Sequence, residues 1–140
     1  MDPARVLALC QEHAEAEAVE DMDRVLATLV PNPRFEFFPL RRAVGGWDNI
    51  ETFYRTQYPV FATKVLGYEV LREWTNESAA LQEYVIDLAE DDGSTGRYFV
   101  MSMMPVDEAA GLLSGERLYC DDGFVRALLG PLFELLEPIE

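Results

Sequence analysis

The second half of the chain is a nearly unbroken succession of strand-forming segments, and this feature constrains the fold most. The segments "YEVLREW", "AALQEYVIDLA", "RYFVMSMMPV" and "GLLSGERLYCD" are rich in aromatic and β-branched residues. Between the second and the third, "EDDGSTG" predicts a hairpin turn. Because a sheet of this kind must bury one of its faces, the rest of the chain has to supply a covering layer.

That covering layer is predicted to be helical and comes first in the chain. Asp2 followed by Pro3 is a typical helix start. The predicted helices run from Pro3 to about Glu20, from Asp21 to about Leu29, from Asp48 to Pro59, and from Gly123 to Leu129. "VPNP" should end the second helix, "RFEFFPL" should form a strand that "AVGG" breaks, and Pro59 should end the third helix. We therefore expect an α+β fold, with three N-terminal helices on one face of a curved antiparallel sheet and a short C-terminal helix.

Size and charge limit the kind of protein this can be. The length of 140 residues suits a single domain, residues 1–140, with a real core. With 11 basic and 26 acidic side chains the formal net charge is -15, which repels phosphate backbones, so we expect no nucleic acid partner. There is no apolar run of membrane-spanning length and no basic leader, so we expect no membrane partner and a cytoplasmic location.

The sequence lacks the residues that several kinds of functional site require. Cys10 and Cys120 lie far apart, and we expect both to be buried and reduced. His13 is the only histidine, so there is no metal-ligand spacing. The chain also has no glycine-rich phosphate loop and no nucleophile elbow. We therefore expect neither a metal nor another cofactor.

The first helix carries two polar residues on its apolar stripe. At 100° per residue, His13 and Glu17 continue the stripe that Val6, Leu9 and Cys10 begin. Their i, i+4 spacing lets them touch, and a buried carboxylate beside an imidazole is a common acid/base arrangement. The alternative is a hydrogen-bonded core histidine with a glutamate that bends out to water.

The last strand has two faces of different character. Arg117, Tyr119 and Asp121 share one face, and Leu118 and Cys120 share the other. Either set could line the interior. Asp122, which directly precedes the closing helix, is predicted to be its N-terminal cap and to have no role in chemistry.

Three stretches of the chain carry a resemblance: "AEAVEDMDRVLATLVPNPRFEFFP", "GGWDNIETFYR" and "GERLYCDDGFVRALLG". In this order they resemble the nuclear transport factor 2-like superfamily, and within it the branch of SnoaL-like polyketide cyclases and ketosteroid isomerase. "AEAVEDMDRVLATLVPNPRFEFFP" is similar to the branch's first two helices and aromatic strand, and "GGWDNIETFYR" to its glycine and third helix. "GERLYCDDGFVRALLG" resembles the final strand and closing helix, in which an aromatic residue precedes an acid that matches Asp121. Together these stretches span nearly the whole chain.

The resemblance implies a cone-shaped, mixed sheet with a deep pocket between its concave face and the helices, and a homodimer formed through the outer sheet faces. It also favours Asp121 as a residue that faces the pocket. The chain departs from the limonene epoxide hydrolases, which have an Arg and an Asp where Tyr84 and Ile86 stand here. It departs from scytalone dehydratase too, which relies on two histidines.

The predicted function is that of a cofactor-free acid/base enzyme, a cyclase, isomerase or dehydratase that acts on a hydrophobic carbonyl compound such as a polyketide or terpenoid. Asp121 is the predicted acid/base, assisted by His13, Glu17 and Tyr119. The predicted substrate-binding residues are Phe37, Trp47, Tyr54, Tyr84, Met101 and Met103. The alternatives are a non-catalytic ligand-binding or dimerising module of the same fold and, third, an epoxide hydrolase.

Overall fold

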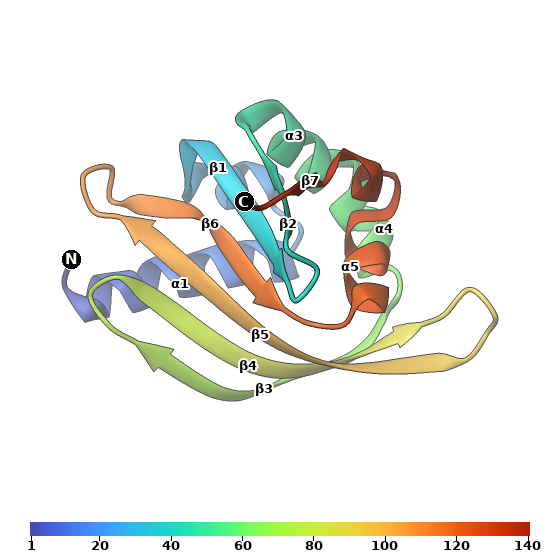
Figure 1. Ribbon diagram of the computed structural model, residues 1–140. Coiled ribbons are helices and arrows are strands. Elements are labelled where there is room, and N and C mark those ends of the chain that lie inside the picture. Colours follow the sequence, from blue (N-terminus) through green and yellow to red (C-terminus); the bar gives the residue numbers. More distant parts are fainter.

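The computed structural model describes all residues from 1 to 140 (Figure 1). Its elements, in chain order, are α1 (Pro3–Ala18), α2 (Met22–Ala27), β1 (Leu29–Phe38), β2 (Arg42–Gly45), α3 (Trp47–Thr52), a π-helical turn (Phe53–Gln57), α4 (Tyr58–Ala62), β3 (Val65–Thr75), β4 (Ala79–Ala89), β5 (Thr95–Asp107), β6 (Leu112–Tyr119), α5 (Asp122–Leu129), a 3-10 turn (Gly130–Leu135) and β7 (Glu137–Pro138). The predicted α+β class is confirmed. No helix is both long enough and apolar enough to cross a membrane.

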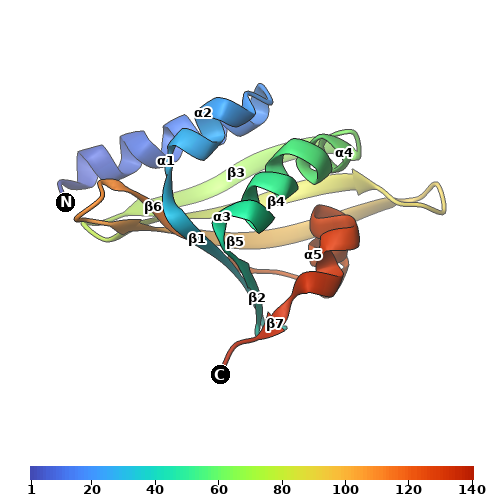
Figure 2. The same cartoon turned by 90° about the horizontal axis from the view of Figure 1, so that it is seen from above.

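The seven strands form one curved sheet in the order β3-β4-β5-β6-β1-β2-β7. Strands that neighbour each other in the sheet pair antiparallel, except that β6 pairs parallel with β1. Figure 2 shows α1 to α4 on the same side of the sheet, with α5 closing one end. The mixed, cone-like sheet with helices on its concave face is therefore as predicted.

Three predicted boundaries are wrong, and prolines are the reason for two of them. "VPNP" does not separate a helix from a strand, because β1 already begins at Leu29 and runs through it. The pairing of β1 with β6 is irregular between Leu29 and Arg34, so the prolines lie where no ladder N–H is required. "AVGG" likewise does not simply break the strand, since most of it forms β2.

Pro59 was expected to end the third helix, but the helical path continues to Ala62. The π-helical turn interrupts the regular hydrogen bonds, and α4 restarts at Tyr58. Pro59 then occupies the first turn of α4, where a missing N–H costs nothing.

The core lies between the concave face of the sheet and the helices. From α1 it receives Val6, Cys10, His13 and Ala16, and from α5 the side chains of Phe124, Val125, Leu128 and Leu129. Both cysteines are buried and free, as predicted. The core does not fill all of the space under the helices, and the remaining cavity is the candidate site.

Candidate active site

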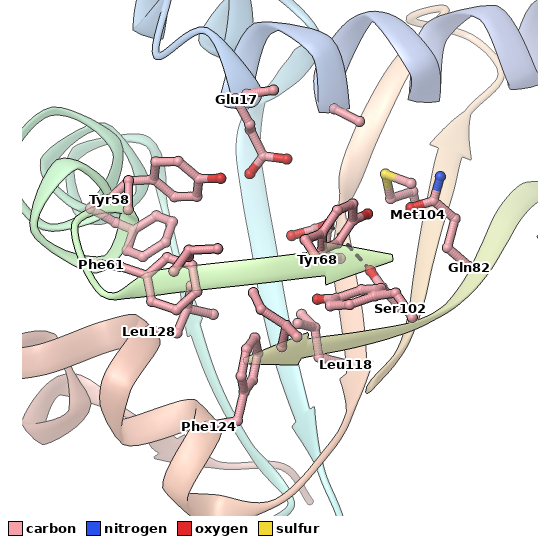
Figure 3. Close-up of a pocket in the computed structure, with 18 of the residues that line it drawn as sticks. Glu17, Tyr58, Phe61, Tyr68, Gln82, Ser102, Met104, Leu118, Phe124 and Leu128 are labelled. Carbon is pink, nitrogen blue, oxygen red and sulfur yellow. Dashed lines mark hydrogen bonds between the residues drawn. The ribbon is translucent and has the colours of Figure 1, made fainter. Parts of the chain in front are cut away.

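A cavity of about 440 Å³ opens between the concave sheet face and the helices. This volume is in the usual range of small-molecule sites. Figure 3 shows side chains from α1, α4, α5 and the strands converging on it. The lining residues are Ala14, Glu17, Ala18, Glu20, Phe53, Tyr58, Phe61, Ala62, Val65, Tyr68, Gln82, Tyr84, Ile86, Ser102, Met104, Glu116, Leu118, Phe124 and Leu128.

Glu116 is the acid that β6 contributes to the cavity. Glu116 and Leu118 are two residues apart and so share one face of the strand, and both side chains line the cavity. Its Oε1 accepts a hydrogen bond of 3.3 Å from the Ser102 hydroxyl on β5, and the other carboxyl oxygen has no protein partner. Burial disfavours the charged form and raises the pKa of Glu116 to about 7. The carboxyl is therefore poised to exchange a proton near neutral pH.

The backbone before Glu116 requires a glycine. Gly115 has a φ of +142°, and a Cβ there would lie only 1.9 Å from the carbonyl oxygen of Arg34 on β1. The parallel strands β6 and β1 therefore approach at a point that only glycine permits. This contact sets the position from which Glu116 points into the cavity.

Glu17 supplies the second acid from the last turns of α1. Its side chain is 18% exposed because it faces the cavity. The pKa of Glu17 is well above its ordinary value, first because of burial and then because of the nearby charge of Glu116. A hydrogen bond from the Tyr54 hydroxyl, 3.2 Å from Oε2, opposes this rise.

A buried hydrogen-bond chain lies behind Glu17. The Thr28 hydroxyl donates to the carbonyl of Val25 at 2.6 Å, so its oxygen accepts from His13 Nδ1, 2.7 Å away. His13 Nε2 then carries the lone pair and lies 3.1 Å from the Tyr54 hydroxyl. Burial lowers the pKa of His13 to about 4, so the ring is neutral at pH 7.

The single proton of Tyr54 has two possible acceptors. When Glu17 is ionised, Tyr54 donates to it, and His13 Nε2 has no other donor. When Glu17 is protonated, Tyr54 can donate to His13 while Glu17 donates to the Tyr54 oxygen. Both Tyr54 and His13 Nε2 have all their hydrogen-bond partners only in the second state, which agrees with the raised pKa of Glu17.

Three tyrosines and one glutamine complete the polar lining. Burial raises the pKa of Tyr58, Tyr68 and Tyr84, so their hydroxyls keep their protons at neutral pH. The Gln82 amide nitrogen donates to Glu73 at 2.6 Å, and its carbonyl oxygen has no protein partner. No group of three His, Cys, Asp or Glu side chains is arranged to hold a metal ion.

The structure brings several of the predicted site residues together. Glu17 and Tyr84 line the cavity. His13 and Tyr54 are fully buried immediately behind Glu17, and the two open alternatives for His13 meet in one arrangement, since it is a hydrogen-bonded core histidine that also contacts Glu17.

Asp121 and Tyr119 lie outside the cavity. Asp121 is exposed and caps α5, where its carboxylate accepts from the Gly123 N–H at 2.7 Å. The cap predicted for Asp122 is therefore wrong, since Asp122 is already the first residue of the helix. Tyr119 stacks on Phe38 with ring centroids 5.0 Å apart, on the outer sheet face. The polar face of the last strand points outward because its neighbours Glu116 and Leu118 point inward.

Of the six predicted substrate-binding residues only Tyr84 lines the cavity, since Tyr54 is buried behind Glu17 and the other four lie elsewhere. Phe37 is fully buried in the core, and Trp47 is partly buried against it. Met101 and Met103 pair with Tyr119 and Arg117 on the outer face of the sheet. Along β5 the inward positions belong instead to residues of the opposite parity, which include Ser102 and Met104.

Sequence reasoning missed Glu116, the acid that the sheet contributes to the cavity. The signal was available: Glu116 and Leu118 share a face, so choosing Leu118 as the inward residue selects Glu116 as well. Tyr58 and Tyr68 were missed because a helix of five residues and an edge strand have little periodicity of their own.

Comparisons with known proteins identify the fold. No family sequence profile matches the chain, and no curated protein matches it. Among solved structures, an LEH-like epoxide hydrolase of M. tuberculosis superposes with a TM-score of 0.66 at 22% identity, covering 95% of this chain and 96% of that one. An NTF2-like protein of unknown function from Cytophaga hutchinsonii gives a TM-score of 0.67 at 12% identity over 83% and 99% of the two chains. The fold is that of the nuclear transport factor 2-like superfamily.

A candidate ketosteroid isomerase from Kribbella flavida shares the nuclear transport factor 2-like fold, with a TM-score of 0.66 at 15% identity over 86% of this chain and 80% of that one. At these identities the likeness is one of fold, and the fold hosts more than one activity. The SnoaL-like branch therefore stays a prediction. At the positions where limonene epoxide hydrolases are expected to have their Arg and Asp, Tyr84 and Ile86 both line the cavity.

Proposed function

We propose that this protein is a cofactor-free acid/base enzyme that transfers protons on a hydrophobic carbonyl compound. One observation carries the proposal: a mostly apolar cavity contains two carboxyl groups, Glu17 and Glu116, whose pKa values are both raised by burial, and the charge of Glu116 raises that of Glu17 further. Because two neighbouring carboxyl groups in an apolar site do not readily ionise together, one can keep its proton as the acid while the other accepts a proton as the base. This replaces Asp121 with Glu116 as the reacting acid/base.

Glu116 is the general base. With a pKa of about 7, a large fraction is ionised at neutral pH, and the hydrophobic surroundings strengthen it as a proton acceptor. It removes a proton from the carbon next to the carbonyl group. The electron pair of the broken C–H bond then forms the enolate, whose negative charge rests on the carbonyl oxygen.

Glu17 is the general acid, because burial and the nearby charge of Glu116 both raise its pKa and so favour its protonated form. It can donate its proton, or a hydrogen bond, to the enolate oxygen, and the neutral tyrosine hydroxyls offer further donors. Return of the proton from Glu116 to a different carbon gives an isomerase. Attack of the enolate carbon on a second carbonyl gives a cyclase, and loss of hydroxide as water, with the proton from Glu17, gives a dehydratase.

The likeness in fold to a candidate ketosteroid isomerase supports this class of reaction. So does the apolar lining, in which 14 of 19 residues are hydrophobic, because it leaves the carboxyls poorly solvated. The reaction chosen among the three depends on the substrate.

Exchange of deuterium from heavy water into hydrophobic ketones, starting with β-tetralone and followed by NMR, tests the proposal. The wild-type protein should accelerate exchange above the buffer rate. Glu116→Gln should reduce this acceleration by about 100-fold or more, the usual contribution of a general base. Glu17→Gln should also reduce it.

Asp121→Asn is the matched control, since Asp121 is exposed and outside the cavity. It should keep the full exchange rate. Full activity in Glu116→Gln, or loss in Asp121→Asn alone, would contradict the assignment. Binding of ketones without any accelerated exchange would favour the non-catalytic binding module instead.

A further inference from the structure

The charged groups that line the cavity are all of one sign. They are Glu17, Glu20 and Glu116, and no Lys, Arg or His side chain lines it. His13 touches Glu17 from behind but is buried and neutral at pH 7. The cavity thus offers no cation to pair with an anionic ligand, while its own carboxyl groups have no protein cation to pair with.

Several polar atoms in the cavity are free to accept hydrogen bonds, and the hydroxyls of Tyr58, Tyr68 and Tyr84 can either donate or accept. One carboxyl oxygen of Glu116 has no protein donor, and the other receives only the long bond from Ser102. Gln82 uses its amide nitrogen on Glu73, which leaves its carbonyl oxygen as an acceptor. An occupant that brings several N–H donors would match this set.

The walls are aromatic. Six rings line the cavity: Phe53, Tyr58, Phe61, Tyr68, Tyr84 and Phe124. Tyr68 and Tyr84 lie side by side on the sheet with centroids 5.1 Å apart, and Tyr58 and Phe61 lie 5.8 Å apart on α4. Figure 3 shows Tyr58 and Tyr68 extending toward the space that Glu17 also enters. Aromatic faces attract cations as well as hydrocarbon.

From these contacts we propose that the cavity binds hydrophobic primary amines, with the ammonium group at Glu116 and the hydrocarbon against the aromatic walls. This inference rests on the carboxyl pair used in the proposed function, but it does not require turnover. An ammonium ion offers three donors to the free acceptor oxygens of Glu116 and Gln82, and its positive charge pairs with the Glu116 carboxylate, which has no protein cation beside it. Such amines therefore compete with the carbonyl substrate, and carboxylates of the same shape are rejected.

Isothermal titration at pH 8 with three probes of matched shape tests the charge preference. The probes are naphthylethylamine, naphthylethanol and the carboxylate of naphthylacetic acid. The amine should bind at least about 10-fold more tightly than the alcohol, and the acid should bind most weakly. Equal affinity for amine and acid, or no binding of the amine at millimolar concentration, would overturn the inference.

Two variants locate the ammonium group. Glu116→Gln should weaken amine binding by about 30-fold or more, as expected for loss of a buried charge partner, and should change alcohol binding by no more than about twofold. Glu83→Gln is the matched control, because Glu83 lies on β4 of the same sheet but outside the cavity lining, and it should keep the affinity of the wild type. An unchanged amine affinity in Glu116→Gln would remove Glu116 from the site.

The two proposals fail separately. If the amine is preferred but no ketone exchanges its protons, the enzyme proposal falls and the amine site stands. If Glu116-dependent exchange occurs while amine and acid bind alike, the amine inference falls and the enzyme proposal stands.

Discussion

At the level of single residues, Glu116 couples function to stability. The folded protein holds the Glu116 proton up to about pH 7, whereas an unfolded chain releases it near the ordinary value of 4.5. Between these values the folded state binds more protons, so the contribution of Glu116 to stability falls as the pH rises. A residue poised for proton transfer thus destabilises the fold at alkaline pH.

Replacing this carboxyl should therefore stabilise the protein in a pH-dependent way. We expect Glu116→Gln to raise the free energy of unfolding at pH 8, by up to roughly 3 kcal/mol for a shift of this size, and to change it much less at pH 5. Urea denaturation at the two pH values measures the difference. The same gain at both values would show that the charge is not the cause.

His13 acts in the opposite direction and at lower pH. Its folded pKa of about 4 lies below the ordinary 6.5, so the unfolded chain binds more protons between these values. The contribution of His13 to stability is complete above pH 6.5 and is lost as the pH falls through 4. The comparison at pH 8 is therefore free of the His13 effect.

At the level of elements, the contact between β6 and β1 places the base. Gly115 is the residue that permits it, since a Cβ there would overlap the Arg34 carbonyl. Gly115→Ala should destabilise the protein by about 1–3 kcal/mol, because one strand has to shift, and should displace Glu116 and slow proton exchange in the ketone assay. Thermal unfolding and that assay measure the two effects.

Gly93 provides the control for Gly115. It also has a positive φ, of +86°, but a Cβ there meets nothing within 4 Å. Gly93→Asn should therefore change stability by about 1 kcal/mol or less and leave proton exchange unaltered, since Asn tolerates this backbone region. Equal effects of the two variants would mean that the strand contact is not critical.

At the level of the whole molecule, we propose that the outer sheet face pairs two copies of the chain, as the family resemblance implies. The face exposes large apolar side chains, among them Phe99 at 65% and Trp74 at 45%. It also carries both signs of charge, such as Arg117 beside Glu36, which allows one copy to complement another.

Light scattering after gel filtration tests this pairing. The wild type should have twice the mass of one chain, and Phe99→Asp should weaken or abolish the dimer. Val60→Asp is the control, because Val60 is also exposed but lies on α4 in the helical layer. A monomeric wild type would contradict the pairing, and so would a Phe99→Asp variant that dimerises normally.

Much of the fold could be predicted because its signals are local. The helix start at Pro3, the strand segments after Tyr68 and the hairpin turn each depend on neighbouring residues, and the structure confirms them. The boundaries at "VPNP" and Pro59 could not be predicted, since both depend on strand irregularity or a π-helical turn that removes the need for an N–H.

The candidate site, like the fold, could be predicted only in part. The α+β class, the strong negative charge, the pairing of His13 with Glu17 on one helix stripe and the two alternating sets of side chains on the last strand all follow from the sequence. Which set faces the cavity depends on contacts between distant parts of the chain. Alternation with period two defines the faces of a strand but not which face the helices cover, and that depends on the curvature of the sheet and the pairing of β6 with β1. This pairing turned Glu116 inward and left Asp121 outside as a helix cap.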